Sequence, residues 1–172
     1  MRSVWTVTVL LAMAGTASAQ EKRVIQLPGA PEGLPFSTAV QVGNVLYLSG
    51  QIGTSPGTVQ LVPGGITAEV RQTLENIKRT LEQVGSSMER VFKCTVFLVD
   101  INDFNAMNEV YRTYFPKDPP ARSTVAGSGL ALGARAEIEC LAAQEKQAIQ
   151  PGANLSAAVR VGNVLYLSGQ LG

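Results

Sequence analysis

The sequence has 172 residues, 45% of them hydrophobic, and its 14 basic and 13 acidic side chains leave a formal net charge of +1. A nearly neutral chain lacks the basic surplus of nucleic-acid-binding proteins, which argues against RNA or DNA as the main partner. Histidine is absent, so Ser-His-Asp and Cys-His catalytic pairs and HExxH zinc sites are excluded.

The first segment, 1–19, has the parts of a secretory signal peptide. Arg2 supplies a positive charge, 4–14 is apolar and uncharged, and Ala17-Ser18-Ala19 is a small-x-small cleavage pattern. A buried helix or a short membrane anchor is the alternative, but the apolar run is shorter than the about 20 residues that span a bilayer. We therefore expect a periplasmic or secreted mature protein, without membrane attachment after cleavage.

The next segment predicts three strands separated by turns. The first strand is 23–27, and the following two, 39–42 and 45–49, are joined at Gly43-Asn44, a pair that tolerates positive φ. Prolines and glycines between 51 and 65 predict a loop.

The clearest predicted helix covers 67–84. Its apolar residues recur on one face, as in a helix that packs on a sheet, and Gly85 is a plausible C-terminal stop; they are Val70, Leu74, Ile77, Leu81 and Val84. A buried strand follows at 91–99.

A second helix is predicted to begin at a cap, Asn102 or Asp103, and to end before Pro116. Its inward residues are predicted to be Phe104, Met107, Val110, Tyr111 and Tyr114. The last two strands are 122–126 and 135–143. The predicted order β-β-β-α-β-α-β-β is an α+β domain in which one sheet carries two helices on one face.

The two cysteines, Cys94 and Cys140, are far apart in the sequence and lie in apolar, strand-like runs. Export would permit a disulfide between them. Their apolar surroundings favour buried free thiols instead.

Ten residues, 42–51, recur without change at 161–170. Such a repeat indicates an internal duplication. We therefore expect one complete domain at 20–145, with the full site, and the first strands of a second unit at 146–172. The tail alone has little core to cover its apolar strands, so it is expected to be poorly ordered or to lie against an exposed sheet edge, and the natural protein to continue past Gly172.

Several segments between Ile25 and Ala143, in the same order, resemble the RidA family, also called YjgF/YER057c/UK114. They are Pro35-Phe36-Ser37-Thr38-Ala39-Val40, Leu48-Ser49-Gly50-Gln51-Ile52-Gly53, Thr73-Leu74-Glu75-Asn76-Ile77, Thr95-Val96-Phe97-Leu98, Asp100-Ile101-Asn102-Asp103-Phe104, Pro120-Ala121-Arg122-Ser123 and Glu137-Ile138-Glu139. The resemblance implies a chorismate-mutase-like fold and a homotrimer with ligand clefts between subunits. It also implies hydrolysis of enamines and imines such as 2-aminoacrylate and 2-iminopropanoate to 2-oxo acids and ammonia, without a metal or an organic cofactor.

Arg122 is the first candidate catalytic residue. It follows Pro119-Pro120-Ala121, which restricts where the strand begins. A guanidinium group presents a planar fork that binds a carboxylate through two hydrogen bonds, as a small 2-imino acid requires. The alternative is a solvated surface arginine.

Glu137 is the second candidate, at the position where the resemblance places a water-orienting carboxylate. A partly desolvated carboxyl group can direct water to the imine carbon and then deliver a proton to the leaving nitrogen. Strand alternation places Glu137 and Glu139 on one face. The alternative, a pair that only faces solvent, remains open, above all for Glu139.

Substrate-binding positions are implied at Ser49, Gly50, Phe36, Asn108 and Thr124. The backbone N–H of Gly50 would share the substrate carboxylate with Arg122, although a strand end also needs glycine for structural reasons. The chain departs from the family where Phe36 replaces the usual tyrosine, Thr38 the frequent glutamine and Thr124 the common cysteine. Proton transfer near Phe36 is therefore in question.

The sequence thus predicts an exported imine deaminase that acts on small imino acids. Two alternatives remain: a module that binds small carboxylates without chemistry, and an endoribonuclease. The neutral charge and the absent histidine argue against the endoribonuclease.

Overall fold

The computed structural model describes residues 21–30, 33–143, 147–148, 158–161 and 164–169. The predicted signal peptide, 1–19, lies outside these ranges. Within them, no helix is long and apolar enough to cross a membrane.

The central sheet has seven strands, six of them in the order β1-β2-β3-β7-β5-β6, and the short β4 also pairs with β7. All neighbours are antiparallel except β5 and β6, which run parallel. The strands are β1 (Lys22–Ile25), β2 (Ala39–Val42), β3 (Val45–Leu48), β4 (Gln51–Ile52), β5 (Val91–Leu98), β6 (Ala121–Ala126) and β7 (Ala136–Ala143). Short 3-10 turns lie at Met88–Arg90, Ile101–Asp103 and Ala131–Gly133.

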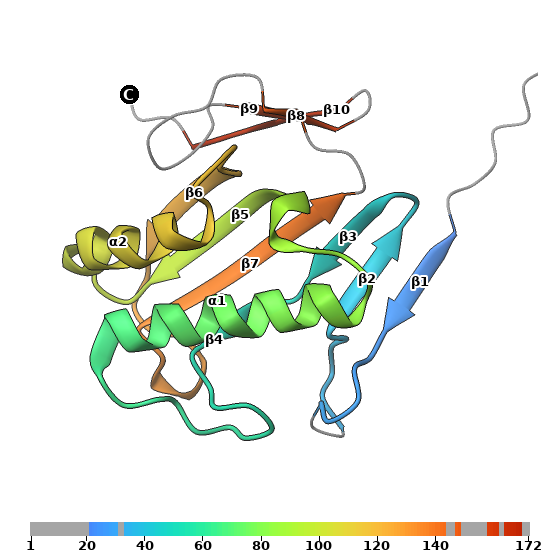
Figure 1. Ribbon diagram of the computed structural model, residues 1–172. Helices are drawn as coiled ribbons and strands as arrows, with labels where there is room; N and C mark the ends of the chain where they lie inside the picture. The colour runs from blue at the N-terminus through green and yellow to red at the C-terminus, as the bar shows by residue number, and fades with distance from the viewer. Residues whose placement is uncertain (1–20, 31–32, 144–146, 149–157, 162–163, 170–172) are drawn as a thin grey trace, which may run out of the picture.

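Two helices, α1 (Gly65–Gln83) and α2 (Phe104–Tyr114), cover one face of this sheet (Figure 1). The predicted apolar face of α1 packs on the sheet, with four residues fully buried and Val84 partly buried. After α1, Gly85 adopts φ 77° and its N–H donates to the carbonyl of Glu82. The predicted α+β fold is confirmed.

The predicted inward face of α2 is partly wrong. Met107, Val110 and Tyr111 are buried, but Phe104 is exposed and Tyr114 is only partly buried. Tyr114 instead reaches α1, where its hydroxyl donates to Glu75 Oε1 at 2.6 Å. The two residues are the first and the last of α2: the Phe104 ring centroid lies 5.8 Å from the Arg122 guanidinium carbon, and Tyr114 packs against the rim of the core.

The prediction of free thiols is also wrong, because Cys94 and Cys140 form a disulfide. The two residues face each other on the antiparallel pair β5 and β7, with their Cα atoms 4.2 Å apart. This register brings together residues 46 positions apart in the sequence.

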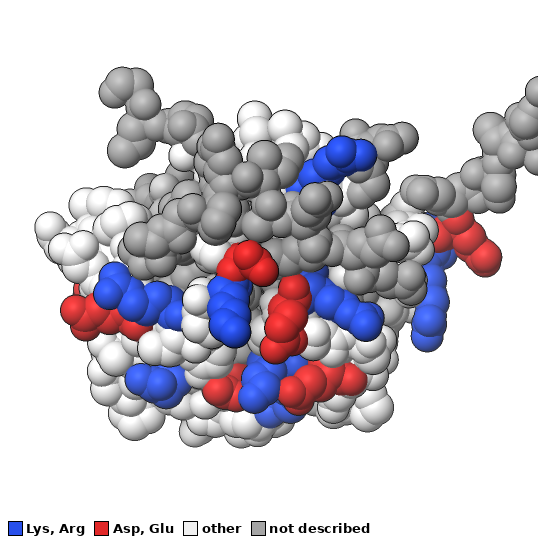
Figure 2. All heavy atoms as spheres, turned by 45° about the horizontal axis from the view of Figure 1, so that its top comes forward, with Lys and Arg blue, Asp and Glu red and all other residues white. Residues whose placement is uncertain are grey.

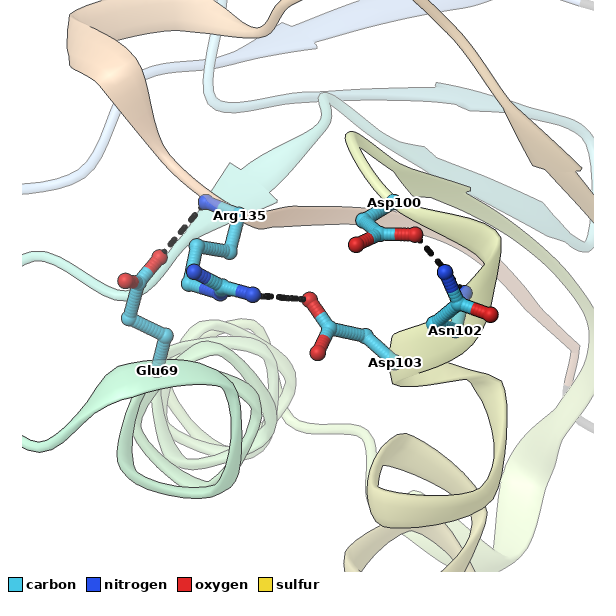
Figure 3. A network of polar contacts seen from close by, with 5 residues as sticks. All are labelled: Glu69, Asp100, Asn102, Asp103 and Arg135. Atoms are coloured by element: carbon cyan, nitrogen blue, oxygen red, sulfur yellow. Dashed lines mark hydrogen bonds and ion pairs between the residues drawn. The ribbon is translucent and has the colours of Figure 1, made fainter.

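A polar network ties the start of β7 to both helices (Figure 3). Glu69 of α1 accepts a hydrogen bond from the backbone N–H of Arg135 at 2.8 Å, and the Arg135 guanidinium pairs with Asp103 at 2.7 Å. Asp103 occupies the N-cap position of α2 without a side-chain capping bond, whereas Asp100 caps the preceding turn by accepting from the N–H of Asn102. The network positions the strand that carries Glu137.

The tail forms a small three-stranded sheet of β8 (Gln147–Ala148), β9 (Ala158–Val161) and β10 (Val164–Leu167). It lies beside β5 and β6 at one end of the main sheet (Figure 1).

Candidate functional site

Arg122 lies near the start of β6, with its side chain beneath α2. It pairs with Cys94 on β5 and so shares the helix-covered face with the disulfide. Its Nη2 donates to Asn108 Oδ1 at 2.7 Å, and its guanidinium carbon lies 4.6 Å from the Tyr111 ring centroid. Arg122 is therefore no solvated surface arginine: only 3% of it is exposed.

The Arg122 guanidinium has no carboxylate partner among the described residues. Within the same ranges its buried Nε has no hydrogen-bond acceptor. Burial lowers the pKa of Arg122, an effect that Tyr111 partly offsets, yet a guanidinium stays protonated in proteins. A buried cation with an unused donor is a receptor for an anion.

Two of the implied binding residues join Arg122. Asn108, which lies on α2, accepts a hydrogen bond from the Arg122 guanidinium. Thr124 lies two residues after Arg122 on β6, on the same face of the strand. In the described part of the chain, the buried Thr124 hydroxyl has no partner either. These three residues form what we call the guanidinium half-site.

The other implied residues line a separate cleft of about 720 Å³, between the loops before β2 and after β4 and one side of α1. Its walls include Phe36, Ser49, Gly50 and Glu137. We call these four residues the carboxylate half-site. Burial, and secondarily the charge of Glu139, raises the pKa of Glu137. A raised pKa suits a carboxyl group that must both take and give a proton.

Gly50 is needed because the chain passes directly over Glu137. A Cβ atom at position 50 would collide with Glu137 Oε1. Between the pairs Tyr47–Leu141 and Gln51–Ile138 the β3–β4 side contains one residue more than β7, which is a bulge. The bulge leaves Gly50 backbone, rather than a side chain, beside the carboxylate.

Ser49 has a structural role in this chain. Its hydroxyl donates to the carbonyl of Ser37 at 2.6 Å, and its N–H donates to the carbonyl of Thr38. These bonds hold the loop that carries Phe36, which is 55% exposed at the cleft.

One chain does not unite the two half-sites. Glu137 alternates with the buried Ala136 and Ile138, so it lies on the face of the sheet opposite the helices. Arg122 lies on the helix-covered face and is absent from the lining of the cleft. Glu137 and Glu139 share a face, as predicted.

Sequence reasoning missed the role of Tyr111, which it assigned only to the core. Its ring supports the guanidinium, and burial raises the pKa of its hydroxyl well above the usual value, so it stays neutral. Its position three residues after Asn108, on the same helix face, was the available signal.

A substitution tests the wall of the cleft. Phe36→Tyr is expected to raise turnover of 2-iminopropanoate, because it adds a hydroxyl group that can relay a proton to the cleft that Glu137 also lines. Turnover is measured by trapping the remaining imine with semicarbazide, and thermal melting confirms folding. Unchanged or lower turnover in a folded variant would mean that Phe36 only packs the wall.

The similarity to known proteins covers most of the chain before the tail. Residues 29–144 match the family model described as Endoribonuclease L-PSP. The chain is 44% identical over 124 residues to the human 2-iminobutanoate/2-iminopropanoate deaminase, covering 72% of this chain and 90% of that protein. It is 46% identical over 125 residues to a RutC family protein of Pyrococcus horikoshii, covering 72% and 99%.

Solved structures agree with these relatives. RidA from an Antarctic Psychrobacter species superposes with a TM-score of 0.65 at 38% identity, covering 70% of this chain and 98% of that one. The YjgF gene product of Escherichia coli superposes with a TM-score of 0.66 at 33% identity, covering 72% and 99%. Both the sequence match and the fold extend over nearly the whole length of these proteins, and the chain therefore belongs to the RidA/YjgF (Endoribonuclease L-PSP) family.

Proposed function

We propose that this protein hydrolyses reactive enamines and imines of the 2-aminoacrylate and 2-iminopropanoate type to 2-oxo acids and ammonia. The buried Arg122 guanidinium carries the proposal, because it has an unused donor and no carboxylate partner among the described residues. Curated relatives named 2-iminobutanoate/2-iminopropanoate deaminase, 44% identical to this chain, support it. We also propose that the protein is exported, because residues 1–19 have the parts of a secretory signal peptide.

The chemistry follows from the two half-sites. Arg122 binds the carboxylate of the imino acid, and the Gly50 backbone approaches the same group. Glu137 takes a proton from water while the water oxygen bonds to the imine carbon, and it returns the proton to the nitrogen. The product of this addition is an amino alcohol, and Glu137 next carries its hydroxyl proton to the nitrogen. As the C=O bond then forms, the C–N bond breaks and ammonia leaves, so water and imine are converted into a 2-oxo acid and ammonia.

The complete site requires two subunits. Arg122 and Glu137 lie on opposite faces of one sheet, so one small substrate contacts both only where the guanidinium half-site of one chain meets the carboxylate half-site of another. We propose a homotrimer with such a site at each interface, as the resemblance implied.

The alternative functions have less support. An endoribonuclease needs a surface that attracts phosphates. On the face drawn in Figure 2, basic and acidic side chains are interspersed and form no patch of one sign. A carboxylate-binding module without chemistry would use the guanidinium half-site but gives no role to the raised pKa of Glu137.

Mixing two inactive variants tests the proposal. Arg122→Ala and Glu137→Gln chains are each expected to be nearly inactive. Unfolded and refolded together, they should recover up to about a quarter of wild-type hydrolysis, since that fraction of interfaces joins an intact Arg122 to an intact Glu137. Sizing of residues 20–144 should give about three times the monomer mass.

Two outcomes would contradict this proposal. No hydrolysis by the wild-type protein would reject the deaminase. Wild-type hydrolysis without recovery in a mixture that demonstrably contains mixed oligomers would reject the site between subunits.

A further inference from the structure

The tail hairpin is a second copy of the β2–β3 hairpin in sequence and in register. Residues 158–170 match 39–51 at every position except Arg160, which replaces Gln41. Val159 pairs with Tyr166 as Val40 pairs with Tyr47, and the other three pairs correspond in the same way. β8 pairs with β9 as β1 pairs with β2. The tail therefore repeats the first three strands of the domain.

This second hairpin binds the backbone of Arg122. The Arg122 N–H donates to Ser168 Oγ, and the Gly169 N–H donates to the Arg122 carbonyl, both at 3.0 Å. Lys93 Nζ donates to the carbonyl of Leu167 at 3.0 Å. Ser168 and Gly169 are the copies of Ser49 and Gly50, the residues at the carboxylate half-site.

Apolar contacts accompany these hydrogen bonds. Val159 is fully buried against the open face of the sheet, which is the face opposite the helices. The ring centroids of Tyr166 and Phe92 lie 4.3 Å apart. The surface that receives the hairpin, which we call the docking surface, consists of Phe92, Lys93, Ala121, Arg122 and Ala143.

The first hairpin presents the same side chains without using them in this way. Ala39 is buried in the core under the helices, so its neighbour Val40 lies on the open face of the sheet, paired with the exposed Tyr47. Each copy of the chain thus carries the docking surface and, elsewhere on the same face of the sheet, the β2–β3 hairpin, whose side chains match those of the docked tail hairpin. A contact between two such different surfaces is heterologous, and its repetition can close a ring.

We propose that the docking surface accepts the β2–β3 hairpin of a second copy of this chain, and that the tail hairpin competes with it from within the chain. This competition rests on the subunit assembly of the proposed function, since without assembly the tail has no rival. A tethered segment acts at a high effective concentration, so the tail opposes assembly strongly at low protein concentration.

The docked tail also blocks the chemistry. It brings Ser168 and Gly169 to Arg122, but residues 147–172 contain no aspartate or glutamate. Residues 147–172 therefore bring no carboxylate side chain to the guanidinium half-site. The tail is an autoinhibitory contact, because it occupies the Arg122 backbone that the Ser49–Gly50 segment of a second copy would bind.

A matched pair of substitutions tests this competition. Val159→Glu places a carboxylate in the buried contact of the tail, whereas Val40→Glu places the same carboxylate in the hairpin that would bind in trans. Since burying an unpaired carboxylate is costly, Val159→Glu should lower the protein concentration of half-assembly at least about tenfold, and Val40→Glu should raise it by a similar factor. Sedimentation velocity over a concentration series measures both shifts.

Deletion of 147–172 should act in the same direction as Val159→Glu, and thermal melting verifies that each variant is folded. An unchanged assembly midpoint in both Val159→Glu and the deletion would overturn the inference, as would shifts of the same sign in the two valine variants. The assay needs no substrate, so it separates the two proposals. Opposite shifts without imine hydrolysis would reject only the proposed reaction.

Discussion

Arg122→Ala is expected to reduce imine hydrolysis almost to background. The substrate carboxylate loses a charge-assisted pair worth at least about 2–3 kcal/mol, which corresponds to an about 30- to 150-fold fall in kcat/KM. The guanidinium has an unused donor and no carboxylate partner in the described part of the chain, so its removal leaves no buried anion unpaired. The semicarbazide assay with purified protein measures the loss.

Two further variants separate charge, geometry and packing at this position. Arg122→Lys keeps a charge but loses the planar fork, and we expect it to be almost as inactive as Arg122→Ala. Arg122→Met keeps apolar contact with Met107 and Tyr111, so it should lose activity while its melting temperature stays the same or rises.

Arg135→Lys is the control for the loss of an arginine. Arg135 pairs with Asp103 outside both half-sites (Figure 3), and Arg135→Lys keeps both a cation beside Asp103 and the backbone N–H that bonds to Glu69, so wild-type turnover is expected. Turnover like that of the wild-type protein in Arg122→Ala would reject the proposed mechanism.

Glu137→Gln is the second substitution with a large expected effect. It keeps the shape of the side chain but removes the group that takes and returns the proton, so turnover should fall by about 10²-fold or more. Substrate binding should change little, because Arg122 holds the carboxylate, and the loss should therefore appear in kcat rather than in KM.

The pH profile distinguishes this role from a structural one. If the ionised Glu137 directs water, wild-type turnover falls as the pH drops through its pKa, which burial and Glu139 raise above the ordinary 4.5. Glu139→Gln removes the second cause, so the acidic limb should move to lower pH while turnover persists. An acidic limb that does not move, in a folded Glu139→Gln variant, would assign the limb to another group.

The same pKa shift predicts the direction of a stability change. A carboxyl group whose pKa is raised on folding destabilises the folded state above that raised pKa, and the penalty vanishes below the unfolded value of about 4.5. Glu137→Gln should therefore melt at the same or a higher temperature than the wild-type protein at pH 7. The difference should disappear as the pH falls below about 4.5. A lower melting temperature at pH 7 would instead assign Glu137 a stabilising role.

The sequence by itself determined the local elements and the family motifs. The apolar period of 67–84 predicted α1, because successive helical turns place the apolar residues on one side of the helix. This holds whichever surface the helix then packs against. The repeat of 42–51 predicted a duplicated hairpin for the same reason, since identical segments have identical local preferences. Strand alternation also placed Glu137 beside Glu139 on one face.

The tertiary structure alone decided how these elements meet. Alternation states which residues of one strand share a face, but not which face the helices will cover, so the separation of Arg122 from Glu137 was not predictable. Pairing of Cys94 with Cys140 depends on the register of two strands far apart in the chain. The two-residue β4 has too short a pattern to predict and exists because β7 provides its hydrogen bonds. Docking of Ser168 and Gly169 on Arg122 likewise depends on the exposed edge of β6, which forms only after the sheet has folded. In each case two segments that are distant in the sequence come into contact through packing, and not through local preference.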